Sequence, residues 1–193
     1  MRRILFLLGL MTAASSVAVS QSVPDRSIPP SAPSTTSTIE PPRLPLLSVQ
    51  CRGADLSVRQ VSDDAAMGGE HLVLYAWRNN SSMPCTLKGY PRYELLDKLG
   101  AVPPRGRAIN SQQLPGDDEK MRPQLVTIKA AQETWFRVHY NSGGAGYLGK
   151  PCPVSRKVRI VAPGTTRAFI LKENITSCRT VEVSTVRPEP LPQ

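Results

Sequence analysis

The segment from Leu72 to Trp77 constrains the fold more than any other part of the chain. Alternate residues along an extended strand face opposite sides, and here both sets are apolar: Leu72, Leu74 and Ala76 on one face, Val73, Tyr75 and Trp77 on the other. A strand that is apolar on both faces is normally covered on both faces. The polar cluster at residues 79–82 ends the run, as such residues do in turns. The segment therefore predicts a strand in the middle of a packed β structure.

Turn residues recur at short spacing along the rest of the sequence. Short strands are expected at 55–61, 86–88, 92–97, 124–129, 133–140, 157–161, 168–171 and 180–186. Leu56, Val58 and Val61 are predicted to face the core, and residues 62–69 to form a polar turn. We predict a hairpin from 124–129 and 133–140, and a long exposed loop over the proline-rich residues 102–123. With about eight or nine short strands and no long 3.6-residue apolar period, the chain is predicted to be all-β, an antiparallel β-sandwich.

The two ends of the chain differ in composition from the middle. Residues 1–20 have a basic start at Arg2-Arg3, an apolar stretch and small residues near a cleavage site, which predicts a signal peptide. The apolar stretch is shorter than the about 20 residues of a membrane-spanning helix, so no stable membrane anchor is expected if the signal is cleaved; an uncleaved anchor is the alternative. Residues 21–45 are predicted to be a Pro/Ser/Thr-rich disordered linker, 46–187 the β-sandwich domain and 188–193 a disordered tail.

The chain contains four cysteines, and in an exported protein these predict two disulfide bonds. Three pairings are possible, and the sequence alone does not select one. We predict Cys51–Cys85 and Cys152–Cys178, which close two local loops. No Cys-x-x-Cys is present and the chain has only two histidines, so no metal site is predicted. The first cysteine is Cys51, which excludes lipid attachment at a processed N-terminal cysteine.

The formal net charge is +9, and loss of Arg2 and Arg3 with the signal lowers this by two. A basic protein favours anionic partners. Residues expected to line an anion-binding surface are Arg105, Arg107, Arg156, Lys157 and Arg159. The partner is predicted to be an anionic envelope polymer or another envelope protein, whereas export argues against nucleic acid. Two alternatives remain: basic residues that only solvate outward strand faces, and sugar stacking by the aromatic residues Tyr90, Tyr93, Trp135 and Tyr147.

No pattern in the sequence points to catalysis or to a cofactor. A hydrolase needs a nucleophile, a base and an orienting group, and neither a Gly-x-Ser-x-Gly nor a Ser-x-x-Lys motif is present. A Ser-His-Asp triad would have to use His71 or His139, and both are interpreted as half-exposed strand residues. The acidic runs 63–64 and 117–119 are interpreted as solvated loop charge. We therefore predict that the protein is not an enzyme.

The cysteine-containing motifs resemble those of a known family. The segment Pro84-Cys85-Thr-Leu87-Lys-Gly89-Tyr90-Pro91, with Cys51 before it, a Leu-Leu-Asp-x-x-Gly turn at 95–100 and the later Cys152-Pro153 and Cys178, is similar to domain of unknown function 4232. The resemblance covers about residues 48 to 186. It implies a secreted bacterial domain with an immunoglobulin-like fold and brings no catalytic residues. Residues 130–132 depart from it, because the family tends to have a Pro-Gly turn there.

Together these features predict an uncharacterised exported bacterial β-sandwich, periplasmic or extracellular. Its expected role is that of a non-catalytic binding or interaction module of the cell envelope. The alternatives are an envelope-acting hydrolase and a purely structural or stress-protective domain.

Overall fold

The computed structural model describes residues 49–144 and 151–190. The predicted signal peptide 1–20, the predicted linker 21–45 and the last three residues of the predicted tail lie outside the described residues. The strands are β1 (Leu56–Ala66), β2 (Glu70–Asn79), β3 (Cys85–Lys88), β4 (Arg92–Leu96), β5 (Ile109–Asn110), β6 (Leu125–Ile128), β7 (Glu133–Asn141), β8 (Val154–Val161), β9 (Ala168–Thr176) and β10 (Glu182–Val183). A short 3-10 turn, η1 (Gly53–Asp55), precedes β1. None of the described residues belongs to a helix long and apolar enough to cross a membrane.

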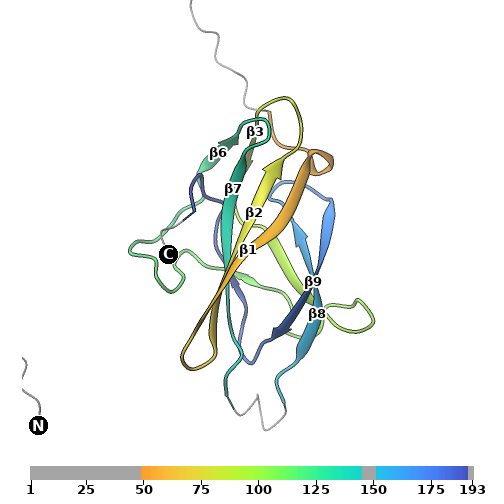
Figure 1. Ribbon diagram of the computed structural model, residues 1–193, viewed down its shortest axis with the longest axis vertical. Helices are drawn as coiled ribbons and strands as arrows, with labels where there is room; N and C mark the ends of the chain where they lie inside the picture. The colour runs from red at the N-terminus through yellow and green to blue at the C-terminus, as the bar shows by residue number, and fades with distance from the viewer. Residues whose placement is uncertain (1–48, 145–150, 191–193) are drawn as a thin grey trace, which may run out of the picture. The chain divides into compact units, whose positions relative to one another are not determined.

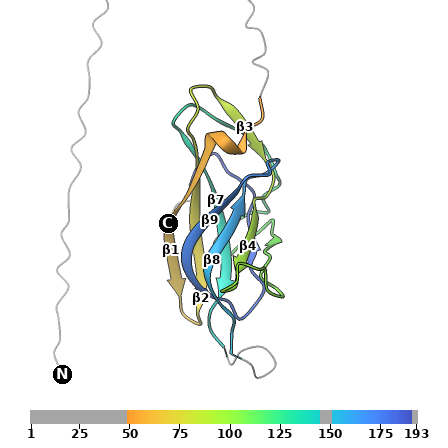
Figure 2. The same ribbon diagram turned by 90° about the vertical axis from the view of Figure 1, so that its right-hand side faces the viewer.

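The strands form two facing layers and a small extra sheet. One layer is a five-stranded sheet with the order β1-β2-β7-β10-β5, and the other is a three-stranded sheet with the order β4-β8-β9. The two-stranded β3–β6 sheet lies at the upper end of the domain in Figure 1, and Figure 2 shows the layers from the side. All pairs are antiparallel except β10–β5, which is parallel. The prediction of an all-β sandwich is confirmed.

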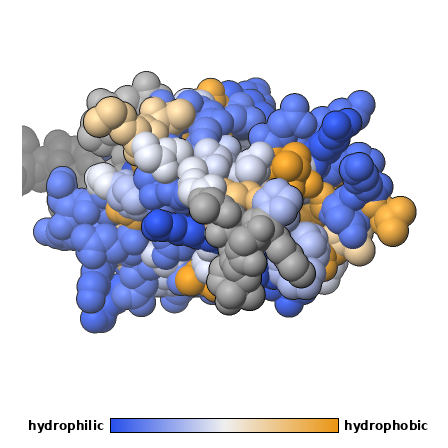
Figure 3. Space-filling model, turned by 90° about the horizontal axis from the view of Figure 1, so that it is seen from below, coloured by the Kyte–Doolittle hydropathy of each residue, from blue (hydrophilic) through white to orange (hydrophobic). Residues whose placement is uncertain are grey.

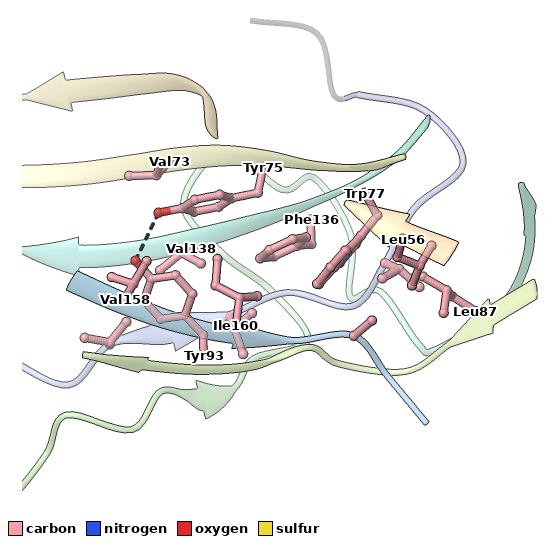
Figure 4. Close-up of a cluster of buried hydrophobic side chains, with 14 of the residues drawn as sticks. Leu56, Val73, Tyr75, Trp77, Leu87, Tyr93, Phe136, Val138, Val158 and Ile160 are labelled. Carbon is pink, nitrogen blue, oxygen red and sulfur yellow. Dashed lines mark hydrogen bonds between the residues drawn. The ribbon is translucent and has the colours of Figure 1, made fainter. Parts of the chain in front are cut away.

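Large side chains from both layers meet in one hydrophobic core (Figure 4). Tyr75 and Trp77 of β2 and Phe136 of β7 are each 0% exposed, and Tyr93 of β4 faces them at 1%. The hydroxyl oxygens of Tyr75 and Tyr93 lie 3.0 Å apart, which joins the two layers by a hydrogen bond. Burying each such aromatic side chain contributes about 1.5–3 kcal/mol. Ala76 on the opposite face of β2 is also 0% exposed, so the prediction of a central strand covered on both sides is confirmed.

The first strand is longer than predicted and contains a bulge. β1 continues to Ala66, and the turn occupies only residues 67–69. The pairing of β1 with β2 shifts between Gln60 and Ser62, which leaves Val61 unpaired and 39% exposed. The prediction that Val61 faces the core is therefore wrong, because the bulge reverses the alternation of the strand at that point.

The predicted hairpin of 124–129 with 133–140 does not form. β6 pairs with β3, so that Val126 lies opposite Leu87, whereas β7 pairs with β2. The buried residues of β6 therefore belong to the β3–β6 sheet and not to a hairpin with β7. Residues 129–132 carry the chain between the sheets through Ala131, which has φ 59°. This left-handed conformation is one that glycine adopts more readily than alanine.

The proline-rich segment 102–123 is only partly an exposed loop. It contains the two-residue strand β5, and its Leu114 is 2% exposed. The loop prediction is thus correct for most of its length, but Leu114 and the strand β5 attach part of the segment to the rest of the domain.

Two disulfide bonds join Cys51 to Cys85 and Cys152 to Cys178. The first connects the entry to the domain with β3, and the second connects the start of β8 with the end of β9. All four cysteines of the chain are used. Two disulfides are consistent with folding in an oxidising environment.

Candidate functional site

The outer face of the three-stranded sheet carries several of the basic residues predicted to bind anions. In β4 and β8, Tyr93 and Val158 point into the core, being 1% and 0% exposed. Because neighbouring residues of a strand face opposite sides, Glu94, Lys157 and Arg159 lie on the outer face. The strand register then decides which of them are neighbours.

The register aligns basic residues across the sheet. Arg159 lies opposite Glu94, and Lys157 lies opposite Lys172 of β9. An isolated bridge pairs Glu94 with Arg107 of the preceding loop. We define the cationic face as Arg92, Arg107, Lys157, Arg159 and Lys172. Glu94 is the only carboxylate at the outward positions of these three strands, so the face has a marked excess of positive charge.

Glu94 holds two of the arginines in place although it is itself buried. Its side chain is 1% exposed. Arg107 donates from Nε to Oε1 at 2.9 Å, and Arg159 donates from Nε to Oε2 at 2.6 Å. Burial alone would raise the pKa of Glu94, but the hydrogen bonds and charges of Arg159 and Arg107 outweigh it and lower that pKa. The carboxylate therefore stays ionised and keeps both guanidinium groups beside it.

The guanidinium groups have donors left over. Arg107 and Arg159 have side chains 68% and 34% exposed, and both contact Glu94 through Nε. They make no further hydrogen bond to the part of the chain that the structure describes. The Nη donors of a guanidinium form a planar fork that matches two oxygens of a phosphate or carboxylate. This part of the cationic face is therefore suited to an anion with several oxygens.

The lysines of the cationic face oppose each other. Lys157 and Lys172 are direct cross-strand partners and both are exposed. Like charges in that position destabilise a sheet by roughly 0.2–1 kcal/mol. A bound anion between them would remove this repulsion, so the pair is chemically suited to an anion.

The other two predicted residues lie apart from this group. Arg156 is exposed next to the bulge between Ser155 and Lys157. Arg105, with φ 64°, lines a cavity of about 340 Å³ that also involves Leu96 and Arg179. The structure thus brings together Arg107, Lys157 and Arg159 and adds two residues that the sequence analysis did not select, Arg92 and Lys172. The alternation of residues along β4 (Arg92–Leu96) would have indicated that Arg92 lies on the outer face.

The aromatic alternative is weakened by burial. Tyr93 is 1% exposed in the core and cannot stack on a sugar. Tyr90 and Trp135 are half-buried, and Tyr147 lies outside the described residues. The three described rings, Tyr90, Tyr93 and Trp135, do not form an exposed platform.

Both histidines lie in strands, half-buried, and each contacts two polar partners. His139 Nε2 lies 2.6 Å from Glu70 Oε2, and its Nδ1 lies 3.1 Å from Glu182 Oε2. His71 Nδ1 lies 3.0 Å from Asp63 Oδ1, and its Nε2 lies 3.0 Å from Ser142 Oγ. The position of both histidines in strands is as the sequence predicts. Nothing in the sequence marked Ser142 as a partner, because His71 and Gly69, which it contacts, are 71 and 73 residues away.

The acidic runs are not simple solvated loop charge. Asp117, with a side chain 2% exposed, lies between Arg137 and Arg187, whose side chains are 8% and 5% exposed. This ion cluster fixes the loop 102–123 on the five-stranded sheet, and Asp63 contacts His71 as described above. No three histidine, cysteine or acidic side chains are grouped for metal binding in residues 49–144 and 151–190.

These observations define a disulfide-linked β-sandwich with a basic face on one sheet. The family model described as Domain of unknown function (DUF4232) matches residues 51–190, and the chain belongs to this family. No curated protein and no solved structure matches the chain.

Proposed function

We propose that the protein is an exported binding module that holds an anionic polymer of the bacterial cell envelope on its cationic face. The observation that carries the proposal is the arrangement of basic residues around one buried carboxylate. Glu94 fixes Arg107 and Arg159, and Lys157 and Lys172 stand directly opposite each other on the sheet. A flat, exposed basic surface of this kind fits an extended chain of phosphate or carboxylate groups.

The predicted signal peptide and the two disulfides support the proposed location. Residues 1–20 have the composition of a signal peptide, and two disulfides join the domain. Binding at the cationic face requires no chemical step, and we assign none to it.

The proposal is tested by retention of the purified exported protein on an envelope fraction and on long-chain polyphosphate over a series of salt concentrations. The informative variant is Lys157→Gln/Lys172→Gln, which removes two charges without disturbing Glu94. Its matched control is Lys88→Gln/Lys129→Gln, which removes two exposed lysines elsewhere.

A plot of log affinity against log salt concentration has a negative slope for such binding. We expect the first double variant to make this slope less steep by about 1.5, as for two lost contacts with nucleic acid phosphates. The control should change it much less. Equal effects of the two double variants, or no retention of the unaltered protein on either material, would contradict the proposal.

A further inference from the structure

The inner face of the five-stranded sheet changes from apolar to polar at its lower end. Along β2 and β7 the pairs Tyr75–Phe136 and Val73–Val138 lie in the core, and the next pair is His71–Tyr140. Ser142 continues the same face of β7 by strand alternation. Figure 3, viewed from below, shows that this end of the domain is mainly hydrophilic. Polar groups on an inner sheet face cost stability unless they are paired, so their contacts here require an explanation.

Asp63, His71 and Ser142 are linked by hydrogen bonds, and we call these three residues the relay. Asp63 Oδ1 lies 3.0 Å from His71 Nδ1, and His71 Nε2 lies 3.0 Å from Ser142 Oγ. Asp63 lies in β1, His71 in β2, and Ser142 directly after the last residue of β7. The ring of His71 is stacked on Tyr140 at 4.5 Å with an interplanar angle of 6°, which fixes its plane. The His71 side chain is 21% exposed, so a small molecule can reach it.

From this geometry we propose that Ser142 is a nucleophile, with His71 as its general base and Asp63 as the residue that positions His71. The reaction is the hydrolysis of a short-chain carboxylic ester. A carboxylate at Nδ1 favours the tautomer that leaves Nε2 free to accept the Ser142 proton. Ser142 Oγ also lies 3.1 Å from the Gly69 carbonyl oxygen, which holds the side chain, but only the histidine nitrogen can carry the proton away.

The bonds and protons balance without any cofactor. Ser142 Oγ attacks the ester carbonyl carbon, and its proton moves to His71 Nε2. The bond from the carbonyl carbon to the alcohol oxygen breaks, and that oxygen takes the proton from His71 and leaves as the alcohol. Water then attacks the acyl group on Ser142 by the same route and releases the carboxylic acid.

A neighbouring cavity favours a small, polar substrate. It has a volume of about 260 Å³ and is lined by Asp63 of the relay and by Tyr140, which stacks on His71. The rest of its lining is mostly polar and includes Lys172 and Glu173. A long apolar acyl chain does not fit such a lining. The Gly143 N–H is donated to Asn141 Oδ1 at 3.0 Å, so we assign no oxyanion donor and expect reaction only with activated reagents.

The test is covalent labelling of the exported protein with a fluorophosphonate, located by peptide mass spectrometry, together with release of p-nitrophenol from p-nitrophenyl acetate. We expect label on Ser142 and none after Ser142→Ala. A positioned general base contributes about 10²–10⁴-fold, so the labelling rate should fall by about 10²-fold or more in His71→Gln and Asp63→Asn.

The matched control is His139→Gln. His139 is half-buried on the same sheet and has two carboxylate partners but no hydroxyl partner, so its loss should leave labelling unchanged. The proposal is overturned if the unaltered protein takes up no label, if the label lies on another serine, or if His71→Gln and His139→Gln label alike. None of these results bears on polymer retention, which tests the proposed binding function separately.

Discussion

Glu94 shows how one residue controls both stability and surface charge. Its carboxylate is buried and has two arginine partners, each held through Nε. Removing one partner of a buried ion pair leaves the other charge uncompensated. At this site the arginines are partly exposed, so the cost is smaller than for a fully buried pair.

We expect Glu94→Gln to lower the free energy of unfolding by about 2 kcal/mol at pH 7, because it weakens two hydrogen bonds to charged groups. The folded-state pKa of Glu94 lies below that of an unfolded glutamate, about 4.3. Its contribution is therefore complete above that pH and is lost as the pH falls through the folded-state value. Urea unfolding at several pH values measures this.

The unaltered protein and the variant should become equally stable at low pH. Glu133→Gln is the control, because Glu133 pairs with Arg59, whose side chain is 56% exposed, and such surface pairs contribute about 0–1 kcal/mol. A Glu94→Gln effect no larger than that of the control would show that the carboxylate is unimportant.

Single residues also limited what the sequence could predict. Asp63 and His71 are eight residues apart, but Ser142 lies 71 residues from His71 in the chain, and nothing local to Ser142 marks its hydroxyl as the partner of a histidine. Asp117 looked like ordinary loop charge because its two arginines lie 20 and 70 residues away. Lys157 and Arg159 were identifiable as outward residues, because they alternate with core positions in the same strand.

At the scale of elements, the central strand was predictable and its neighbours were less so. β2 is apolar on both faces, so burial on both faces follows from its sequence alone. The wrong prediction for β6 and β7 has a different cause: both strands alternate regularly, and alternation does not specify a partner. Which sheet β6 joins depends on the distant residues of β3.

The two disulfides differ in how far their cysteines are exposed to solvent. Cys51 and Cys85 are 3% and 7% exposed, whereas Cys152 and Cys178 are half-buried. The loops have sequence separations of 34 and 26 residues, for which chain entropy gives a similar stabilisation of about 3.5–4 kcal/mol. The difference between the bonds should therefore appear in accessibility rather than in stability.

We expect mild reduction of the native protein to cleave Cys152–Cys178 first, because a reducing thiolate must reach the sulfur. Alkylation of new thiols followed by peptide mapping measures the order. The unfolding free energies of Cys51→Ala/Cys85→Ala and Cys152→Ala/Cys178→Ala provide the comparison, since both should fall by about 3.5–4 kcal/mol. Equal alkylation of all four cysteines at partial reduction would contradict the predicted order.

At the scale of the whole molecule, the core draws on residues from Cys51 to Val186. Folding should therefore not depend on the predicted signal peptide and linker. The part of the chain that enters the sheets begins at Val49 and Gln50, where Thr86 N–H donates to the Val49 carbonyl at 2.8 Å.

A chain of residues 46–190 is expected to melt within about 2 °C of the chain that lacks only the predicted signal peptide, because it retains all the residues on which the core draws. The measurement is sensitive enough, since a loss of 1 kcal/mol would shift the melting temperature of a domain of this size by several degrees. Differential scanning calorimetry measures this. A chain starting at residue 56 is the contrasting case, since it lacks Cys51 and its bond to Cys85, and it should melt much lower. A large drop for residues 46–190 would mean that the N-terminal segment belongs to the domain.

The hydrogen bonds that Glu94 accepts from Arg107 and Arg159 have a consequence for the affinity of the proposed ligand. A free arginine side chain has many rotamers, and immobilising a side chain on binding costs about 0.5–1.5 kcal/mol. Arg107 and Arg159 have already lost much of this freedom, because folding itself ties their Nε atoms to a fixed carboxylate. Under the proposed function, a polymer would meet preorganised guanidinium groups, so each contact would contribute more of its interaction energy to affinity than a contact with a flexible lysine.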